Sequence, residues 1–428
     1  MTPQEAGDLL VQPGGHARSA AEAEVRRSIG GDYGPLYQAA YLLGGLQLLA
    51  LHDELVGPEG VTERAFHDAV LRQNAVPIAM IRAALTDDPL ERDRAPRWRF
   101  AGDVAANESG GPILAEEAAY EVRSYDLAVR VDEKARSIVG TLRMDASLVA
   151  EAKRLALDLD MRLWVDRVAV GGQEVRFEHR DGRIWFDLPA PGAAGSPLEV
   201  VVDYEGTPRP ARRPPWDGGF TWASTPSGKP WIATTCQGEG ADLWWPCKDH
   251  PSDKPETMDL RVTVARDLVC ASNGTLASSD ENPDGTRTWH WRIASPIRAH
   301  NVALNIAPYE RIDAQFTSVG GEVVPVPFYV LPEHAARARK ALPDFLGYMT
   351  FFEDVLGPYP FRNEKWGIAE TPHLGMEHQT IIAYGNEFRK ASFDYDWLHH
   401  HEMCHEWWAN LVTCRDWSHG WLNEGFTT

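Results

Sequence analysis

The chain has 428 residues, of which 43% are hydrophobic, 10% aromatic and 24% charged. This is the composition of folded globular domains, not of disordered or collagen-like chains, and at roughly 150 residues per domain it predicts about three domains. The 42 Lys and Arg against 62 Asp and Glu give a net charge of −20. A surface this acidic repels phosphate backbones, so we expect no nucleic-acid partner.

The termini and the cysteines bear on where the protein resides. No apolar run approaches the roughly 18–20 residues of a membrane helix, so no membrane association is expected. The start, MTPQEAGDLL, lacks the basic stretch and apolar core of a secretory signal. An odd number of cysteines in a chain this long favours a reducing compartment over a disulfide scaffold. Together these observations predict a cytoplasmic protein; the cysteines are Cys236, Cys247, Cys270, Cys404 and Cys414.

The first 86 residues are predicted to be helical. Residues 36–51, LYQAAYLLGGLQLLAL, are apolar almost all round, which predicts a buried helix. Gly44 and Gly45 within it indicate either a kink or close packing. Residues 62–72 and 77–85 continue the helical pattern. Residues 87–116 then shift to Asp, Arg, Pro and Gly and are interpreted as a linker.

From about residue 117 the period changes to two, which predicts a β-domain over residues 117–315. YEVRSYDLAVRV, from Tyr120, alternates apolar and polar residues as a half-covered strand does. Hairpin turns are expected at Gly171-Gly172, at Asp181-Gly182 and at NPDG, residues 282–285. Residues 316–428 are predicted as the last domain, with a strand at 323–331 and a helix at 333–357. The residues that carry chemistry follow this helix.

An H-E-x-x-H motif is formed by His401, Glu402 and His405. On a helix, residues four apart lie about 40° apart around the axis, so both imidazoles can reach one metal ion. Glu402 lies about 100° round from His401, beside the metal and not on it. That is the position of a general base for a metal-bound water.

A catalytic zinc needs a third protein ligand and an open position. The candidate is Glu424, because the chain between it and His405 is long enough for the helix to end and for a second helix to present the carboxylate. His400 and Cys404 are also four apart and form another candidate pair, but no glutamate base or third ligand accompanies them. Otherwise we interpret His399 and His400 as supporting or surface histidines and Cys404 as a buried thiol.

Three motifs resemble one known family. HEMCHEWWANLVTCRDWSHGWLNEGF, residues 401–426, resembles the zinc signature of the aminopeptidase N and leukotriene hydrolase family of gluzincin metallopeptidases. In that family eighteen residues separate H-E-x-x-H from the glutamate of W-L-N-E-G-F-A. GMEH, residues 375–378, resembles the family's G-x-M-E-N element. TCQG at 235–238 and WPCKDHP at 245–251 resemble its glutamine-containing segment and its F-P-C-x-D-x-P. The resemblance covers roughly residues 119–428.

The resemblance implies a metallo-aminopeptidase with one Zn²⁺ per chain. His401, His405 and Glu424 would be the metal ligands. Glu402 would take a proton from the attacking water and later deliver it to the leaving amine. Peptides with a free N-terminus are the implied substrates.

The resemblance also implies a substrate-binding set. Glu377 would bind the free α-ammonium through a charge-assisted hydrogen bond, which excludes acylated termini. Gln237 would accept a hydrogen bond from the same ammonium. Gly375 and Met376 would line the cleft along the substrate strand. His378, where the family most often has Asn, is a further candidate in this set.

These patterns predict a multidomain α+β protein. It would contain a helical N-terminal segment, an antiparallel, saddle-like β-sheet domain and an incomplete thermolysin-like α/β catalytic domain, with the zinc cleft between the last two. The family's catalytic domain continues past its third ligand and supplies an oxyanion-stabilising tyrosine that this sequence does not show. We therefore expect a C-terminally truncated chain, whose missing C-terminal part belongs to the same fold, or completion by another chain.

Residues 1–86 do not resemble that family. They resemble the C-terminal end of an uncharacterised bacterial group with an H-E-x-x-E zinc motif, in Tyr41-Leu42, GLQL at 45–48, FHD at 66–68 and Pro77. This resemblance implies a fused tail with no metal of its own. The leading hypothesis for the whole chain is a zinc aminopeptidase. The alternatives are a catalytically impaired fragment that only binds peptide or metal, and another hydrolase on the same scaffold, such as an epoxide hydrolase.

Overall fold

The computed structural model describes residue 18 and residues 37–57, 61–73, 78–86, 109–390 and 395–427. Over these ranges no helix is both long enough and apolar enough to cross a membrane. The part of the predicted linker before residue 109, and the chain before residue 37 apart from Arg18, lie outside the described residues.

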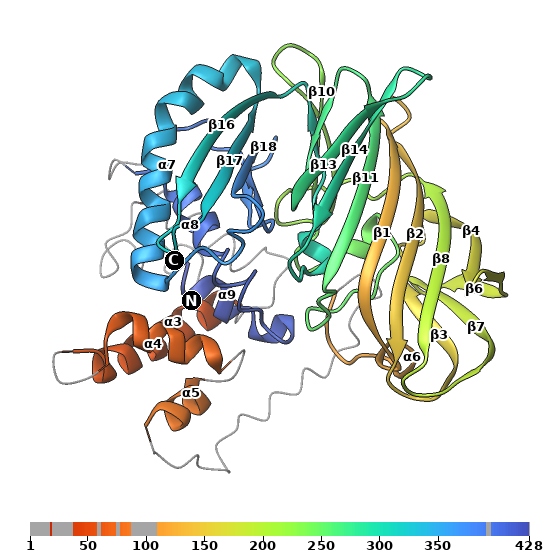
Figure 1. Ribbon diagram of the computed structural model, residues 1–428, viewed down its shortest axis with the longest axis horizontal. Coiled ribbons are helices and arrows are strands. Elements are labelled where there is room, and N and C mark those ends of the chain that lie inside the picture. The colour runs from red at the N-terminus through yellow and green to blue at the C-terminus, as the bar shows by residue number, and fades with distance from the viewer. Residues whose placement is uncertain are drawn as a thin grey trace.

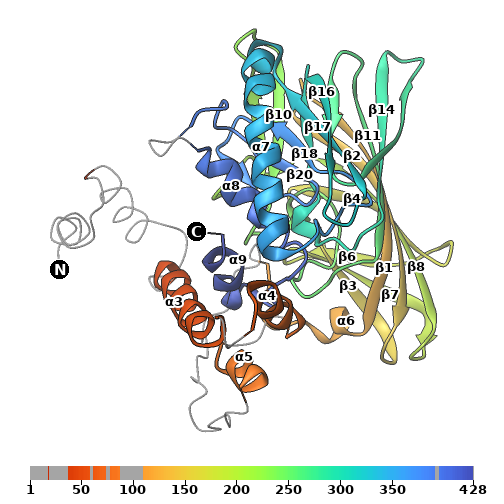
Figure 2. The same ribbon diagram turned by 60° about the vertical axis from the view of Figure 1, so that its left-hand side comes forward.

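The described part of the N-terminal segment forms three helices, as its pattern predicts: α3 (Tyr37–Leu55), α4 (Glu63–Arg72) and α5 (Ile78–Leu85). The hydroxyl of Thr62 caps α4 by accepting a hydrogen bond from the backbone N–H of Ala65 at 3.2 Å. The pattern of α4 turns Phe66 and Val70 into the core. In Figure 2 α3 lies next to α9, α4 lies at the lower end of α7, and α5 lies below α3 and α4.

The expectation that residues 36–51 are buried all round is wrong for the described side chains. Leu48 and Leu51 are 4% and 0% exposed, whereas Leu46 and Leu49 are 52% and 54% exposed. The physical reason is that, among the described residues, α3 lies at the margin of the fold and packs on α5 and α9 along one side. Apolar composition alone did not identify the covered side.

The β-rich part is built around one large sheet, which Figure 1 shows at the right of the molecule. Its order is β13-β14-β11-β1-β2-β8-β4-β5, and only the pair of β1 and β11 is parallel. Along β1 buried and exposed residues alternate, as the period of two predicts. Its strands are β1 (Tyr120–Asp132), β2 (Ser137–Leu148), β4 (Leu163–Val170), β5 (Gln173–Glu174), β8 (Pro197–Gly206), β11 (Thr257–Ala265), β13 (Thr275–Glu281) and β14 (Thr286–Ile293).

Two smaller sheets complete the β-rich part. One has the order β3-β7-β6 and the other β12-β15-β10-β9. The predicted turns are confirmed: Gly171 and Gly172 join β4 to β5, and Asp181 and Gly182 join β6 to β7, all four with positive φ. NPDG joins β13 to β14. The strands are β3 (Ala152–Asp158), β6 (Phe177–Arg180), β7 (Arg183–Gly192), β9 (Gly219–Ser224), β10 (Pro230–Thr235), β12 (Val269–Ala271) and β15 (Asn305–Ala307).

The C-terminal part, which the sequence predicts to be the catalytic domain and which is named the catalytic part, combines a five-stranded sheet, of order β16-β17-β18-β20-β19, with three helices among its described residues. The predicted helix at 333–357 is present as α7, which covers one face of this sheet (Figure 1). β19 is the last strand of the order and pairs only with β20. The elements are β16 (Glu310–Thr317), β17 (Val323–Val330), β18 (Gly367–Glu370), β19 (Gly375–Met376), β20 (Ile381–Tyr384), α7 (Ala335–Leu356), α8 (Trp397–Cys404) and α9 (Trp421–Gly425).

The architecture is therefore α+β, with a helical segment, a mostly antiparallel β part and a mixed catalytic part, as predicted. Two segments lie at the predicted boundaries. α6 (Ala115–Ala118) begins within the predicted linker, and its Glu117 accepts a hydrogen bond from Arg183 at 2.8 Å. β16, which spans the predicted boundary at residues 315 and 316, pairs with β17 of the catalytic sheet.

Side chains join the β part and the catalytic part along a shared seam. Trp231 on β10 donates to the carbonyl oxygen of Glu370 at 3.1 Å. Asn273 donates to the carbonyl oxygen of Gln379, and Asn301 donates to Asn410 at 2.7 Å. The candidate site described next lies along this seam.

Candidate metal and substrate site

The H-E-x-x-H motif lies on α8, as the spacing predicts. Asp396 caps the helix by accepting a hydrogen bond from the N–H of His399 at 3.1 Å. His401 is in the last turn and His405 is the C-cap residue, which still has a helical backbone conformation. The two Nε2 atoms lie 3.3 Å apart. Both imidazoles therefore face the same point.

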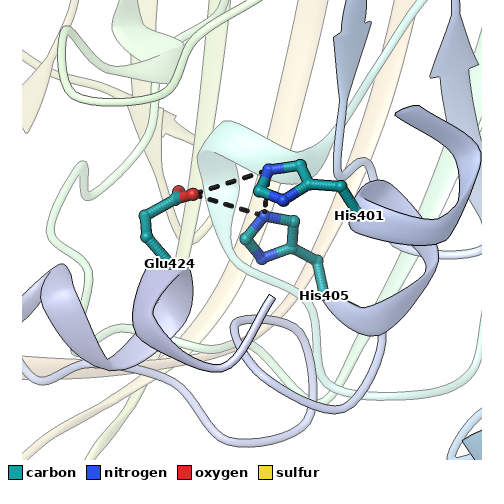
Figure 3. A group of neighbouring side chains, drawn as sticks. All are labelled: His401, His405 and Glu424. Atoms are coloured by element: carbon teal, nitrogen blue, oxygen red, sulfur yellow. Dashed lines mark hydrogen bonds and ion pairs between the residues drawn. The ribbon is translucent and has the colours of Figure 1, made fainter. Parts of the chain in front are cut away.

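Glu424 reaches that point from α9, a helix of five residues. Its Oε2 lies 3.6 Å from Nε2 of His401 and 3.7 Å from Nε2 of His405 (Figure 3). The stretch between the two helices makes this possible: Ala409 adopts a φ of 136°, and a short 3-10 helix spans Trp417–His419. Three ligand atoms from two separate helices thus surround one small volume.

The outer nitrogen of each histidine is also engaged. Nδ1 of His401 donates to the carbonyl oxygen of Thr427, and Nδ1 of His405 donates to the carbonyl oxygen of Trp408, both at 3.0 Å. With Nδ1 protonated, each Nε2 keeps its lone pair toward Glu424. Burial lowers the pKa of His401 to about 4, so this imidazole is neutral at neutral pH. Two imidazoles oriented by backbone carbonyls and one carboxylate are a donor set that fits zinc.

Glu402 lies beside this set. Its carboxylate is 6% exposed and comes within 4.8 Å of the ligand atoms of Glu377 and His405. Burial raises the pKa of Glu402 well above the usual range, and the charges of Glu377 and Glu424 add to the rise. A group placed next to a metal, buried and held at a raised pKa, is suited to taking and returning a proton.

Gly375 is required by the close approach of β19 to α8. A Cβ at this position would lie 2.7 Å from the Leu398 side chain and would overlap the Glu402 carboxylate. The short strand of Gly375 and Met376 therefore passes directly over the candidate base, and Met376 is 5% exposed.

Glu377 and Gln237 come together across the seam, although they are far apart in the sequence. Nε2 of Gln237 donates to Oε1 of Glu377 at 2.6 Å. Asn410 donates to the Glu377 carbonyl oxygen at 2.8 Å, which fixes the backbone. Burial raises the pKa of Glu377 above its usual range, and the nearby Arg298 opposes this rise. The Gln237 amide oxygen remains as an acceptor next to a buried carboxylate.

Two overlapping groups of side chains could each hold a metal ion: His401, His405 and Glu424, or Glu377, Glu402 and His405. We assign the metal to the first. Both of its histidines are oriented by backbone carbonyls, whereas Glu377 already accepts a hydrogen bond from Gln237. The second group would also leave His401 without a role at 3.3 Å from His405.

The substrate-binding role of His378 stays a prediction. Its ring is 1% exposed, and burial beside His373 lowers its pKa to about 3. Among the described residues no hydrogen bond or ion pair connects the His378 ring to Glu377, Glu402 or the histidine pair, and its Nδ1 has no partner. The structure therefore gives no contact that supports the substrate-binding prediction for His378.

Of the neighbouring histidines, His399 is a core residue and His400 is half-buried. The His399 ring stacks on Phe345 at 3.8 Å and is fully buried, so the expectation of a supporting or surface histidine is wrong. The reason is that this side of α8 faces α7 and not solvent. The His400 ring lies 4.7 Å from the Phe352 ring, whereas Sγ of Cys404 contacts the carbonyl oxygen of Phe426. His400 and Cys404 do not form a second metal site, and Cys404 is a buried thiol as expected.

The sequence analysis missed two residues that position the site. Glu406 accepts a hydrogen bond from the N–H of Thr380 at 2.8 Å, and Asn410 links Glu406 to the Glu377 backbone. Burial raises the pKa of Glu406 to about 8. The available signal was a glutamate directly after a ligand histidine, in the buried turn that follows α8.

Two histidines one helical turn apart, a carboxylate from a following helix and a further glutamate beside them define the H-E-x-x-H class of metallopeptidase site. Comparisons with known proteins place the chain within this class. Residues 121–298 match the peptidase M1 N-terminal domain, and residues 367–428 match the peptidase family M1 domain. The chain belongs to the peptidase M1 family, which confirms the resemblance. Neither match extends into residues 1–120, so the resemblance of residues 1–86 to a different bacterial group stays a prediction.

Curated relatives are similar over the same region. Leucine aminopeptidase 2 of Vanderwaltozyma polyspora is 26% identical over 285 residues, which are 62% of this chain and 40% of that protein. The human endoplasmic reticulum aminopeptidase 1 is 27% identical over 265 residues, which are 58% of this chain and 27% of that protein. The chain thus spans less than half the length of either relative.

Solved structures show the same fold. An M1 zinc metallopeptidase from Deinococcus radiodurans matches with a TM-score of 0.61 at 23% identity, over 76% of this chain and 72% of that one. A variant of it bound to a Tyr-Ser-Ala substrate matches with the same TM-score, at 24% identity.

Proposed function

We propose that the protein is a zinc-dependent aminopeptidase that hydrolyses the N-terminal peptide bond of peptides. The observation that carries this proposal is the position of Glu377. A buried carboxylate, paired with an amide at 2.6 Å, lies within 4.8 Å of both the candidate base and a metal ligand. An ammonium held by Glu377 leaves room for a single residue before the scissile bond. The curated relatives are named aminopeptidases, which agrees with cleavage after the first residue.

His401, His405 and Glu424 would hold one zinc ion per chain. When bound there, zinc would polarise the scissile carbonyl and lower the pKa of its water. Glu402 is placed to accept the proton of that water and then to donate it to the leaving amine. Because Glu402 is buried, its proton exchanges with the reacting atoms and not with bulk solvent.

Glu377 and Gln237 would recognise the substrate. Glu377 offers a charge-assisted acceptor to the α-ammonium, and the amide oxygen of Gln237 offers another. An acylated terminus would leave the Glu377 carboxylate buried without its cation, which costs binding energy. β19 has one unpaired edge among the described strands. A peptide could add to that edge as an extra strand, which would hold its carbonyl near Glu402.

The proposal is tested with a panel of fluorogenic aminoacyl amides, each with an N-acetylated twin and a chelator control. We expect chelator-sensitive cleavage of the free-amine set only. Equal cleavage of both sets would contradict the role of Glu377. Zinc and peptide binding without turnover would favour the alternative, a protein that only binds peptide or metal.

Glu377→Gln sharpens this test. We expect kcat/KM for free-amine substrates to fall about 10- to 100-fold, because a hydrogen bond to a charged group contributes about 1.5–3 kcal/mol. The matched control is Glu333→Gln, since Glu333 is exposed and lies in the 3-10 turn just before α7. Unchanged discrimination between the free and acetylated twins in Glu377→Gln would refute the assignment.

We also propose a cytoplasmic location, in which the five buried free thiols remain reduced. Cell fractionation with a thiol-alkylation assay checks this. Recovery of the native chain in a membrane or secreted fraction would refute it.

A further inference from the structure

The N-terminal segment and the helix that carries the third ligand are in direct contact. α3 packs against α9, and the two helices lie side by side in both views of the molecule (Figures 1 and 2). Neither family match includes α3. The contact therefore joins a segment outside the matched regions to the position of Glu424.

Two adjacent glycines make this contact. A Cβ on Gly44 would lie 2.9 Å from Cδ2 of the Trp421 ring and would overlap Cε3. A Cβ on Gly45 would lie 3.3 Å from the carbonyl oxygen of Gly425. Of the two interpretations of this glycine pair, close packing applies, because α3 continues through it as one helix.

The contact covers a defined face of α9. Trp421 and Gly425 are four residues apart and so share one side of the helix, which faces α3. Glu424 lies about 100° round from Gly425, toward the histidine pair. A displacement of α9 away from α3 therefore moves the Glu424 carboxylate relative to both imidazoles.

α9 cannot fix its own position. A helix of five residues makes too few internal hydrogen bonds to be stable by itself. At the C-terminal end of α9, the Phe426 ring stacks on Trp408 at 3.6 Å with the ring planes 4° apart. Two contacts thus hold α9, one to Trp408 and one to α3.

α3 is itself anchored to the catalytic part. Phe66 and Val70 of α4 belong to the same buried cluster as α7, α8 and Leu422 of α9. His67 Nδ1 contacts the carbonyl oxygen of Val355 on α7 at 3.0 Å. Glu54 and Arg82 form an ion pair that ties α3 to α5. Because the segment is anchored in this way, its contact with α9 can fix the position of α9.

We propose that α3, through Gly44 and Gly45, is a positioning element that holds Glu424 in reach of the metal. This inference rests on the metal set of the proposed function. It predicts that crowding the α3–α9 contact weakens zinc binding without unfolding the chain. It assigns to residues 37–86 a role in the peptidase site, where the sequence alone indicated only a fused tail.

The test is Gly44→Ala in the full chain, with Gly347→Ala as the matched control. Gly347 is on α7 with nothing within 4 Å of an added Cβ. Both substitutions raise helix propensity, so on propensity alone neither destabilises the fold. We measure zinc affinity by competition with a chromophoric chelator, the visible spectrum of the Co²⁺ form, and the melting temperature of the chelator-treated protein.

We expect Gly44→Ala to weaken zinc affinity about tenfold or more and to change the Co²⁺ spectrum, because displacing a group that orients a ligand typically costs about 10–100-fold. Gly347→Ala is expected to match the native chain. Adding Trp421→Ala to Gly44→Ala removes the overlapping ring and should recover part of the affinity, so the two changes are not additive.

Unchanged zinc affinity and Co²⁺ spectrum in Gly44→Ala would overturn the inference, whatever its melting temperature. A loss of melting temperature with native zinc affinity per folded molecule would overturn it too, since the contact would then be only structural. If the native chain binds zinc but cleaves no peptide, the aminopeptidase proposal fails while this inference is still decided by Gly44→Ala. If the native chain binds no zinc, both fail.

Discussion

The two helices that supply the candidate ligands are held in opposite ways. α8 is capped by the Asp396 side chain, and its His405 is 1% exposed. α9 has five residues and no side-chain cap, and its Glu424 side chain is 18% exposed. α8 is a core element that carries two candidate ligands, whereas the position of α9 depends on the residues packed against it. The difference teaches that a ligand set can combine one preformed half with one half set by packing.

The largest expected effect comes from the α8 half. Glu402→Gln should lower kcat by about 10²–10⁴-fold with little change in zinc affinity, because the amide keeps the shape but cannot accept the water's proton. Steady-state kinetics and zinc titration of the same preparation check this. Loss of zinc together with activity would mean that Glu402 is itself a metal ligand. The metal would then belong to the group of Glu377, Glu402 and His405.

A change that loosens α9 should instead lower the zinc affinity. Phe426→Ala removes the ring that stacks on Trp408, and we expect zinc affinity to fall about tenfold, through the freedom that α9 gains. Chelator competition measures the affinity, and circular dichroism shows that the fold is retained. If zinc affinity is unaffected, α9 does not need this support and the contrast between the helices is wrong.

The connection between the two helices predicts a pH effect. Lys254 donates to Thr413 Oγ1 at 3.2 Å and to the carbonyl oxygen of Asn410, and burial lowers its pKa to about 7. In the unfolded chain the pKa of a lysine is about 10.4. Between the two pKa values the unfolded chain therefore binds one more proton than the folded chain. The free energy of unfolding therefore rises with pH from about 7 to about 10.

Lys254→Met should remove this rise. Urea unfolding of both proteins at pH 7 and pH 9 checks the prediction, with the native chain gaining stability relative to the variant at the higher pH. Parallel curves would show that Lys254 titrates normally and that the connection is more solvated than its burial indicates.

The smallest expected effect tests the sidedness of α3. Leu49→Ala should change the free energy of unfolding by at most about 0.5 kcal/mol, because the side chain is 54% exposed. Leu48→Ala, one position earlier and buried, should cost about 2–5 kcal/mol. Thermal melts compare the two. Equal losses would mean that α3 is covered on both sides.

The sequence predicted what depends on local spacing. His401 and His405 follow from a four-residue separation on a helix, and the turns at Gly171-Gly172 and Asp181-Gly182 follow from residues that tolerate positive φ. Glu424 was a candidate from its distance along the chain to His405, whereas Glu377 and Gln237 were identified only through the family resemblance, because no local rule joins residues so far apart. Their meeting across the seam is a property of the tertiary fold.

What could not be predicted was contact between distant elements. The glycine pair of α3 allowed both a kink and close packing, and only the position of Trp421 decides between them. His399 was misplaced because three consecutive histidines leave open which one faces the core. In both cases the missing information was the neighbour, which carries no periodic signal in the sequence.

The meeting of α3 and α9 also orders events during synthesis. α3 leaves the ribosome long before α9, and a nascent chain folds from its N-terminal side first. Closing so long a loop costs little extra in equilibrium free energy but slows folding. On the proposal that α3 positions α9, Glu424 therefore reaches the two histidines only after these two distant helices have met.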